Sequence, residues 1–127
     1  MTQILFFPGS LRAGASSTAL LDALIHRLPG GTTAETADIA ALPFYNADHD
    51  GGPATAKLLA QVKAADGVVF VTPEYNYSVP GVLKNAIDWA SRPGYNSVFK
   101  GKPCLIVTTS GGALGGVRAQ GHLRQIL

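Results

Sequence analysis

The stretch from Pro8 to Thr18 has the composition of an anion-binding loop. It contains two glycines, one arginine and no carboxylate, and it leads directly into a predicted helix. Backbone N–H groups at a helix N-terminus, hydroxyl donors and a guanidinium all favour an anion. The stretch therefore predicts a phosphate site, and the alternative is ordinary capping of the helix by Ser17 or Thr18. Its side-chain donors are Ser10, Arg12, Ser16, Ser17 and Thr18.

This loop differs from the phosphate loop of nucleoside triphosphatases. Gly9 and Gly14 have the spacing of a Walker A motif, but Ala15 stands where that motif requires lysine. A phosphate monoester therefore suits the loop better than a nucleoside triphosphate.

A second loop, Pro73–Pro80, could present a flat surface to a planar ligand. Two tyrosines and an asparagine lie in it between two prolines, directly after the apolar run Gly67–Thr72. Prolines restrict the backbone, so the loop could hold its N–H and C=O groups against a heterocycle at little entropic cost. The alternative is that Pro80 begins the next helix and that the tyrosines only pack on the surface.

Ser110–Gly116 is a third loop, with four glycines among its seven residues. It lacks the Gly-x-Gly-x-x-Gly spacing of a dinucleotide site. Its glycines permit close approach to a planar ligand, or they simply make a flexible connection. Together the three loops suggest a ligand with a phosphate at one end and a planar ring at the other, such as riboflavin 5′-phosphate (FMN).

Short apolar runs alternate with longer amphipathic segments, which predicts an α/β fold with a parallel sheet covered by helices on both faces. In such sheets ligands bind beyond the carboxyl ends of the strands, where all three loops are expected. The predicted strands are Gln3–Phe7, Glu35–Ile39, Gly67–Thr72 and Pro103–Thr109, and the predicted helices are Ser17–Leu28, Ala54–Ala65, Gly81–Ser91 and Val117–Leu127.

The composition is that of one folded domain. The chain has 127 residues, of which 46% are hydrophobic and 14% charged, and its single cysteine excludes a disulfide framework. No apolar run approaches the roughly 18 residues of a membrane span, and the first residues lack the basic start of a signal peptide. We therefore expect a soluble cytoplasmic protein.

The charge is unevenly distributed. All eight acidic residues precede Arg92, whereas five of the ten basic residues lie from Arg92 onward. This basic third could meet nucleic acid, an anionic cofactor or an acidic partner. The basic residues form no dense run and carry no interleaved aromatics, so we expect no nucleic-acid binding.

Other reactive residue types are expected to have ordinary roles. Cys104 lies in an apolar run and is predicted to be a buried, inert thiol. His26 and His122 are predicted to lie on helix surfaces, and Lys84 and Asp88 to form a solvated pair one helical turn apart. His49 stands between two aspartates, but adjacent residues point in different directions. We predict no metal site and no side-chain acid, base or nucleophile.

Three segments carry a family resemblance. Gly9–Arg12, Pro73–Trp89 and Ser110–Gly116 closely resemble the NAD(P)H-dependent FMN reductase family. That family is flavodoxin-like and includes quinone, chromate and azo-dye reductases. The middle segment is long and distinctive, and the resemblance spans nearly the whole chain.

The resemblance implies a set of FMN-binding residues. Thr18 departs from it, because many members have asparagine there, but threonine can still donate a hydroxyl. By resemblance, the phosphate would be held by Ser10, Arg12, Ser16, Ser17 and Thr18, the isoalloxazine by Pro73, Glu74, Tyr75, Asn76 and Tyr77, and the third flavin contact would be made by Ser110, Gly111 and Gly112.

The resemblance also implies an activity. NADPH or NADH would pass hydride to flavin N5, and a quinone, flavin, azo compound or metal oxyanion would then take the electrons in a ping-pong cycle. Family members are usually dimers or tetramers, so a homodimer or homotetramer is expected. Two alternatives stay open: a flavodoxin-like electron carrier, although carriers of this kind tend to be strongly acidic, or an inactive, truncated binding module.

The length conflicts with this fold. A flavodoxin-like sheet has five strands in the order 2-1-3-4-5, and the sequence supplies four. We therefore expect residues 1–127 to form a single flavodoxin-like domain of order 2-1-3-4, truncated at its C-terminus or covered there by oligomer contacts. Apolar surface should then be exposed on the fourth strand and on the first and fourth helices.

Overall fold

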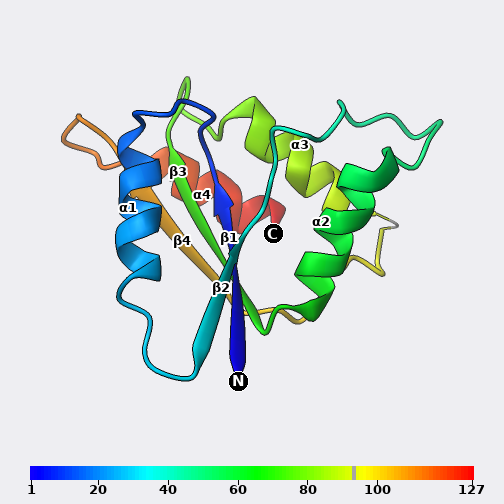
Figure 1. Ribbon diagram of the computed structural model, residues 1–127. Coiled ribbons are helices and arrows are strands. Elements are labelled where there is room, and N and C mark those ends of the chain that lie inside the picture. Colours follow the sequence, from blue (N-terminus) through cyan, green and yellow to red (C-terminus); the bar gives the residue numbers. More distant parts are fainter. Residues whose placement is uncertain (93) are drawn as a thin grey trace.

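A computed structural model describes residues 1–92 and 94–127. The four strands pair in parallel in the order β2-β1-β3-β4 (Figure 1), which matches the first four strands of the flavodoxin-like order. In the described residues no helix is long and apolar enough to cross a membrane. The strands are β1 (Thr2–Pro8), β2 (Thr32–Thr36), β3 (Gly67–Pro73) and β4 (Cys104–Thr109), and the helices are α1 (Ser16–Ile25), α2 (Gly52–Ala64), α3 (Gly81–Ala90) and α4 (Val117–Ile126).

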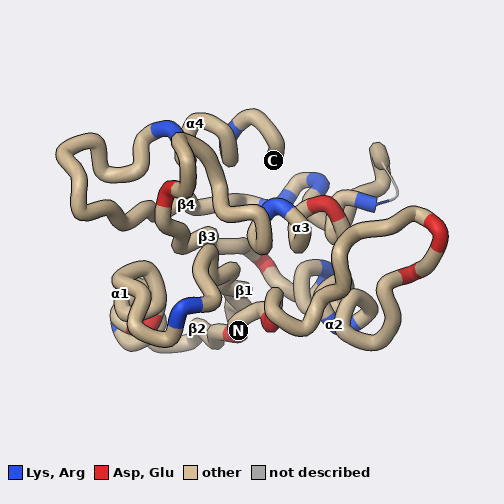
Figure 2. Tube along the Cα trace, turned by 90° about the horizontal axis from the view of Figure 1, so that it is seen from above, with Lys and Arg blue, Asp and Glu red and all other residues tan. Residues whose placement is uncertain are grey.

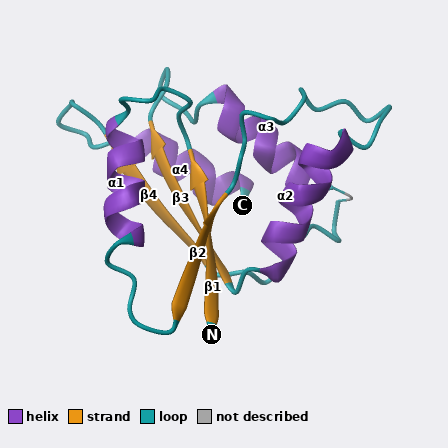
Figure 3. Cartoon of the chain, in the orientation of Figure 1, coloured by secondary structure: helices purple, strands orange, loops and turns teal. Residues whose placement is uncertain are grey.

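Strands β1 and β3 form the centre of the sheet, and both of their faces are covered. Leu5 and Phe7 pack in the cluster that contains the buried residues of α2 and α3, whereas Phe6 packs in the cluster of α1. Every residue of β3 from Gly67 to Thr72 is buried, as a central parallel strand requires. Figure 3 shows helices on both sides of the sheet, so the predicted three-layer arrangement is confirmed.

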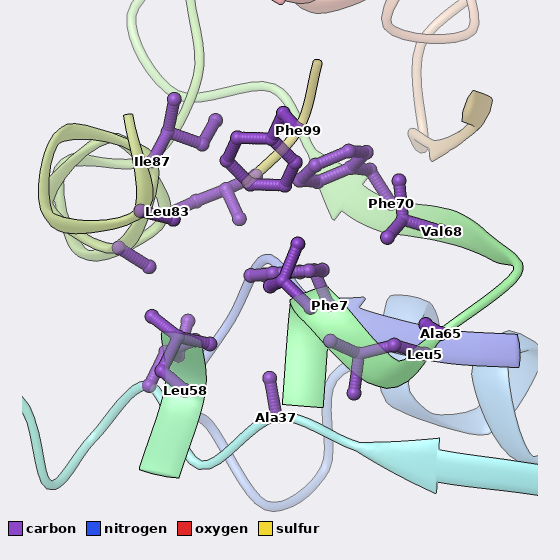
Figure 4. Packing of buried hydrophobic residues seen from close by; sticks show 14 of the residues in the cluster. Leu5, Phe7, Ala37, Leu58, Ala65, Val68, Phe70, Leu83, Ile87 and Phe99 are labelled. Carbon is purple, nitrogen blue, oxygen red and sulfur yellow. The ribbon is translucent and has the colours of Figure 1, made fainter. Parts of the chain in front are cut away.

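Three phenylalanines hold the two central strands in register. Phe7 and Phe70 are paired neighbours on β1 and β3, and their rings stack with centroids 4.8 Å apart. Phe99, from the segment after α3, lies 5.9 Å from Phe7 and 6.1 Å from Phe70 (Figure 4). Each such aromatic pair contributes roughly 0.5–1.5 kcal/mol beyond area burial. The stacking therefore helps to set the carboxyl ends of the two strands side by side.

The second strand lies earlier in the chain than the sequence predicts. We expected it at Glu35–Ile39, and it lies at Thr32–Thr36, where it pairs with Thr2–Phe6 of β1. The apolar residues that suggested the later position, Ala37 and Ile39, are buried in the core after the strand has ended. The apolar character of these two residues therefore reflects burial and does not indicate a strand.

The prediction that Cys104 is a core thiol is wrong. Cys104 is exposed because β4 is the last strand of the sheet in the described residues. Partial burial of the sulfur still raises the pKa of the Cys104 thiol. The expected exposure of apolar surface is observed on β4 and at the end of α4, since Leu105 is 54% exposed and Leu127 is 39% exposed, but it is not observed on α1, where no large apolar residue is exposed. Both residues line a groove of about 820 Å³ beside this strand.

Gly9 allows the chain to leave β1 in close contact with β3. Its N–H donates to the carbonyl oxygen of Val71 at 2.8 Å. A Cβ atom at this position would lie 2.0 Å from Thr72 Oγ1 and 2.6 Å from Thr72 Cα, which is inside van der Waals contact. Because Thr72 Cα is backbone, the clash could be relieved only by separating the two central strands.

We therefore expect Gly9→Ala to lower the free energy of unfolding by about 1–3 kcal/mol or more, as overpacking does. Urea denaturation of the two purified chains would measure the difference. Gly30→Ala is the matched control, because a Cβ atom there meets nothing within 4 Å and the change should stay within about 0.5 kcal/mol. Equal denaturation midpoints for the two variants would contradict the close approach.

Candidate functional site

The three loops singled out in the sequence all lie at one edge of the sheet. They follow the carboxyl ends of β1, β3 and β4, along the upper border of Figure 1. Seen from above, acidic segments gather on the long loop before α2, whereas basic segments lie beside α1 and α4 (Figure 2). The edge therefore brings the three loops together, with Arg12 as the one charged residue of the first loop.

Hydroxyl contacts join the loops to one another. Ser10 Oγ of the first loop lies 3.3 Å from the Tyr75 hydroxyl of the second, and it also accepts the Arg12 N–H at 3.2 Å. Ser16 Oγ donates to Thr109 Oγ1, the last residue of β4, at 3.2 Å. Residues 65 and 93 positions apart in the chain are thus brought within hydrogen-bonding distance.

The N-terminus of α1 is open to an anion. Its N-cap residue is Ala15, no side chain caps it, and its first turn has no acidic residue. Ser17 and Leu21 are the buried residues of this helix, one turn apart. Among the described residues, Ser17 Oγ has no hydrogen-bond partner. An anion over this helix end would satisfy free N–H groups and give the orphaned hydroxyl an acceptor.

Two other helices at this edge already have a carboxylate at their N-termini. Asp50 Oδ1 accepts the Gly52 N–H of α2 at 2.8 Å. Glu74 Oε2 accepts the N–H groups of Arg118 and Ala119 in α4 at 3.0 and 3.2 Å. A negative ligand would be repelled at both places. The N-termini of α1 and α3 have neither a capping side chain nor an acidic first turn. Of the two, only α1 follows a loop that contains an arginine and no carboxylate, which favours α1 as the phosphate end of the site.

The second loop contains a tight hairpin. The Tyr75 and Ser78 backbones exchange two hydrogen bonds of 3.0 Å, and the residues between them are left-handed, with φ of 49° at Asn76 and 65° at Tyr77. Two successive positive φ angles define a type I′ turn, which normally favours glycine or asparagine. Tyr77 is therefore held in a conformation that is costly for a bulky side chain.

The residues of this loop that are predicted to contact the flavin ring face two different parts of the protein, the first loop and α4. Tyr75 points toward Ser10 and is 47% exposed, and the Tyr77 ring lies beneath the Arg118 guanidinium, 4.5 Å from its centroid. The Glu74 carboxylate lies on α4, in a role that the sequence did not suggest. Pro73 ends β3, and Asn76 is exposed at the turn.

The third loop is closed by side chains of β4 and α4. Thr108 Oγ1 donates to the Gly115 carbonyl and accepts from Gln120 Nε2, which ties the end of the loop to the strand. Ser110 Oγ accepts the Gly112 N–H at 3.0 Å. Ser110, Gly111 and Gly112 are exposed beyond the end of β4, beside the first loop through the Ser16–Thr109 contact.

Sequence reasoning missed three residues of this region. Thr109 ends the predicted strand at the carboxyl edge, a position that could have marked it. Arg118 and His122 are one helical turn apart on α4, and they contact Tyr77 and Ser78 of the second loop. No local pattern links α4 to that loop, because the two segments lie about 40 residues apart.

The other reactive residues noted in the sequence lie outside the three loops. Lys84 Nζ and Asp88 Oδ1 lie 2.8 Å apart on α3, as predicted, and His26 is exposed but lies directly after α1, which ends at Ile25. His49 Nδ1 accepts the Gly51 N–H, and its ring packs near Trp89. Within residues 1–92 and 94–127, no three histidine, cysteine or carboxylate side chains form a group that could hold a metal.

The whole chain matches one protein family. The model of the NADPH-dependent FMN reductases covers residues 2–127. The chain belongs to this family. It is 48% identical over 128 residues to an NAD(P)H-dependent FMN reductase of Pseudomonas aeruginosa, and 49% identical over 130 residues to a quinone reductase of Escherichia coli. Each match covers 98% of this chain and 69% of the relative.

Solved structures of FMN reductase relatives agree with the fold. FerB, a flavoenzyme NAD(P)H:(acceptor) oxidoreductase of Paracoccus denitrificans, superimposes with a TM-score of 0.91 at 35% identity, over 98% of this chain and 70% of that one. The predicted membership of the FMN reductase family is thereby confirmed, together with the flavodoxin-like fold and the oxidoreductase class. The chain spans about 70% of the length of these relatives.

The orphaned hydroxyl of Ser17 gives a test of the phosphate end. We expect Ser17→Ala to leave the unfolding free energy of the ligand-free chain unchanged or to raise it, because an unpaired buried hydroxyl carries a desolvation cost. The same variant should bind FMN about three- to tenfold more weakly, the value of one hydrogen bond. Urea denaturation and quenching of flavin fluorescence measure the two effects.

Thr55→Val is the control for this experiment. Thr55 Oγ1 is the other buried hydroxyl without a partner in the described residues, and it lies on α2. Its removal should affect stability in the same direction and leave FMN affinity unchanged. A Ser17→Ala chain that is destabilised and binds FMN normally would show that the hydroxyl is structural.

Proposed function

We propose that this chain binds FMN at the carboxyl edge of its sheet and uses it to oxidise NADPH or NADH and to reduce a quinone. The observation that carries the proposal is the N-terminus of α1, which has no capping side chain and no acidic residue in its first turn. The loop that leads into this helix contacts the tyrosine loop, since Ser10 Oγ lies 3.3 Å from the Tyr75 hydroxyl. A phosphate end and a ring end are thus adjacent.

The phosphate would be held by the first loop. The N–H groups at the start of α1 and the hydroxyls of Ser10, Ser16, Ser17 and Thr18 supply neutral donors, and Arg12 supplies the only charge of this loop. The guanidinium gives directional, charge-assisted hydrogen bonds to phosphate oxygens. Because Arg12 is exposed, its side chain is free to turn toward a ligand.

The ring would be held by the second and third loops. Pro73–Tyr77 would offer the left-handed hairpin and its tyrosines, and Ser110, Gly111 and Gly112 would offer backbone without bulky side chains. A rigid hairpin loses little entropy on binding. Glu74 would hold the loop against α4 and would not contact the ring, since its carboxylate already accepts two hydrogen bonds from that helix.

Bound FMN would supply the redox chemistry, which transfers a hydride equivalent from the nicotinamide and two electrons to the acceptor. The chain's own residues bind and orient. The exposed Tyr75 and Tyr77 line a surface that is open to solvent, so we infer that the nicotinamide and the acceptor occupy it in turn, as a ping-pong cycle requires. No side chain is assigned as an acid or base.

Two arginines near this edge suit anionic substrates. Arg12 lies in the first loop, whose Ser10 contacts Tyr75, and the Arg118 guanidinium lies over the Tyr77 ring. The net charge of +2 also differs from the strongly acidic character of flavodoxin-like electron carriers. An enzyme that receives NADPH directly fits this charge better than a carrier that docks on basic partners.

The activity is tested by anaerobic reduction of the FMN-loaded chain. NADPH or NADH should bleach the visible absorption of the bound flavin, and a quinone added afterwards should restore it. Mixing in a stopped-flow instrument gives the rate of each half-reaction. Flavin that binds tightly but is reduced no faster than free FMN would identify an electron carrier, and a chain that does not bind FMN would refute the proposal.

The phosphate site is tested by comparing FMN with riboflavin. We expect Arg12→Gln to weaken FMN binding by about tenfold or more, the value of a charge-assisted hydrogen bond, and to leave riboflavin binding unchanged. Arg27→Gln is the control, because Arg27 lies beyond the other end of α1 and donates to the Ala23 carbonyl. Equal losses for both flavins would contradict an Arg12–phosphate contact.

A further inference from the structure

Glu74 is one of only two glutamates in the chain, and its carboxylate is used away from its own loop. The N-cap of α4 is Gly116, which has no side chain to satisfy the first N–H groups of that helix. Glu74 Oε2 accepts two of them, from Arg118 at 3.0 Å and from Ala119 at 3.2 Å. Its side chain is only 16% exposed. The tyrosine loop thus provides the missing cap of α4.

Two further contacts join the same pair of elements. The Arg118 guanidinium lies 4.5 Å above the Tyr77 ring, and Ser78 Oγ lies 2.7 Å from His122 Nδ1. Arg118 and His122 are four positions apart, so they lie on one face of α4. Three of the five residues from Glu74 to Ser78 therefore contact the first two turns of this helix.

These contacts oppose the strain in the hairpin. Tyr77 has a φ of 65°, a conformation that is costly for a non-glycine residue and persists only when surrounding structure holds it. The two Tyr75–Ser78 backbone hydrogen bonds close the hairpin but do not fix its direction. The Arg118 stacking fixes the ring of Tyr77, and the Glu74 carboxylate fixes the base of the loop.

We propose that Glu74 and Arg118 are positioning residues that lock the tyrosine hairpin onto α4 in its left-handed, ligand-ready conformation. The same carboxylate occupies the N-terminus of α4, which therefore does not favour a phosphate there. The effect on flavin rests on the proposed function. The coupling between the loop and α4 concerns the protein alone and is tested without a ligand.

The test compares Glu74→Ala with Glu74→Gln in the 127-residue chain. Amide hydrogen exchange by NMR should show Arg118 and Ala119 exchanging about tenfold faster in Glu74→Ala, because a lost N-cap removes their acceptor. Tyr75 and Ser78 should exchange faster as well, since the hairpin loses its anchor. Glu74→Gln keeps an acceptor oxygen without the charge, so it should recover part of the protection.

The second readout is the flavin. Glu74→Ala should bind FMN about tenfold more weakly and should alter the visible circular dichroism of the bound isoalloxazine, with Glu74→Gln again intermediate. Glu35→Ala is the matched control, because Glu35 also accepts two hydrogen bonds, from Gln3 and Gln61, but lies on β2. It should leave all these readouts at their wild-type values.

Arg118→Met removes the ring contact, together with the 3.9 Å ion pair between the Arg118 guanidinium and Glu74 Oε1, and keeps the cap. The backbone N–H groups that Glu74 Oε2 accepts are still present, so the Ala119 amide should stay protected, while the isoalloxazine dichroism should change because Tyr77 is released. Arg124→Met, in the last turn of α4, is its control. If Glu74→Ala does not fold, the proposal is tested by Glu74→Gln alone, which should show a partial loss of amide protection at Arg118 and Ala119 and a partial change in flavin dichroism.

The outcomes are distinct. Wild-type amide protection at Arg118, Ala119, Tyr75 and Ser78 in both Glu74 variants would overturn the coupling. A wild-type chain that binds no FMN would instead overturn the proposed function. Faster exchange in the Glu74 variants together with unchanged FMN affinity and dichroism would show that the contact is structural only, which also refutes a positioning role.

Discussion

The parallel pairing of β1 with β3 is the contact on which the other features of this molecule depend. Phe7 stacks on Phe70 across the pair, and Gly9 continues against Thr72 without room for a side chain. Because the strands are parallel, both end at the same edge, and the loop that follows each one emerges there. The contact between Ser10 and Tyr75 is a direct result of this register.

Once the loops share an edge, the charges at the helix N-termini decide what each can bind. Parallel strands joined by helices direct the positive ends of those helices toward the same side as the ligand. Asp50 and Glu74 occupy the N-termini of α2 and α4. The start of α1 has Arg12 and hydroxyl groups close by and no carboxylate in its first turn. Two carboxylates thus exclude an anion from α2 and α4, and of the remaining helix ends, α1 and α3, only α1 follows a loop with a basic residue.

Element positions were predictable where burial and secondary structure coincide. Gly67–Thr72 is apolar at nearly every position because it is covered on both faces, and its predicted and observed bounds agree closely. The predictions failed where a buried residue lies outside a strand or where a strand residue is exposed. Ala37 and Ile39 are buried outside any strand, and Cys104 is apolar in context but lies at the open edge of the sheet. Apolar character reports burial, and burial depends on neighbours that the local sequence does not contain.

The candidate site was predictable as a set of loops and only partly as a set of roles. Glycine, proline and hydroxyl content reflects how each loop can bend and what it can donate, so these properties can be read from composition alone. The family resemblance added the assignment of FMN to them. Neither source indicated that the Glu74 carboxylate would cap α4, since that contact joins residues 44 and 45 positions apart.

Local sequence was enough to predict the alternation of strands and helices, the three loops and the family to which the chain belongs. These follow from local periodicity, from glycine and proline content and from motif spacing, all of which act over a few residues. Long-range packing sets which helix ends carry a carboxylate, which hydroxyls are left without a partner and which helix holds the strained Tyr77. Those outcomes depend on distances between segments far apart in the chain, because hydrogen bonds and ion pairs act only over a few ångströms.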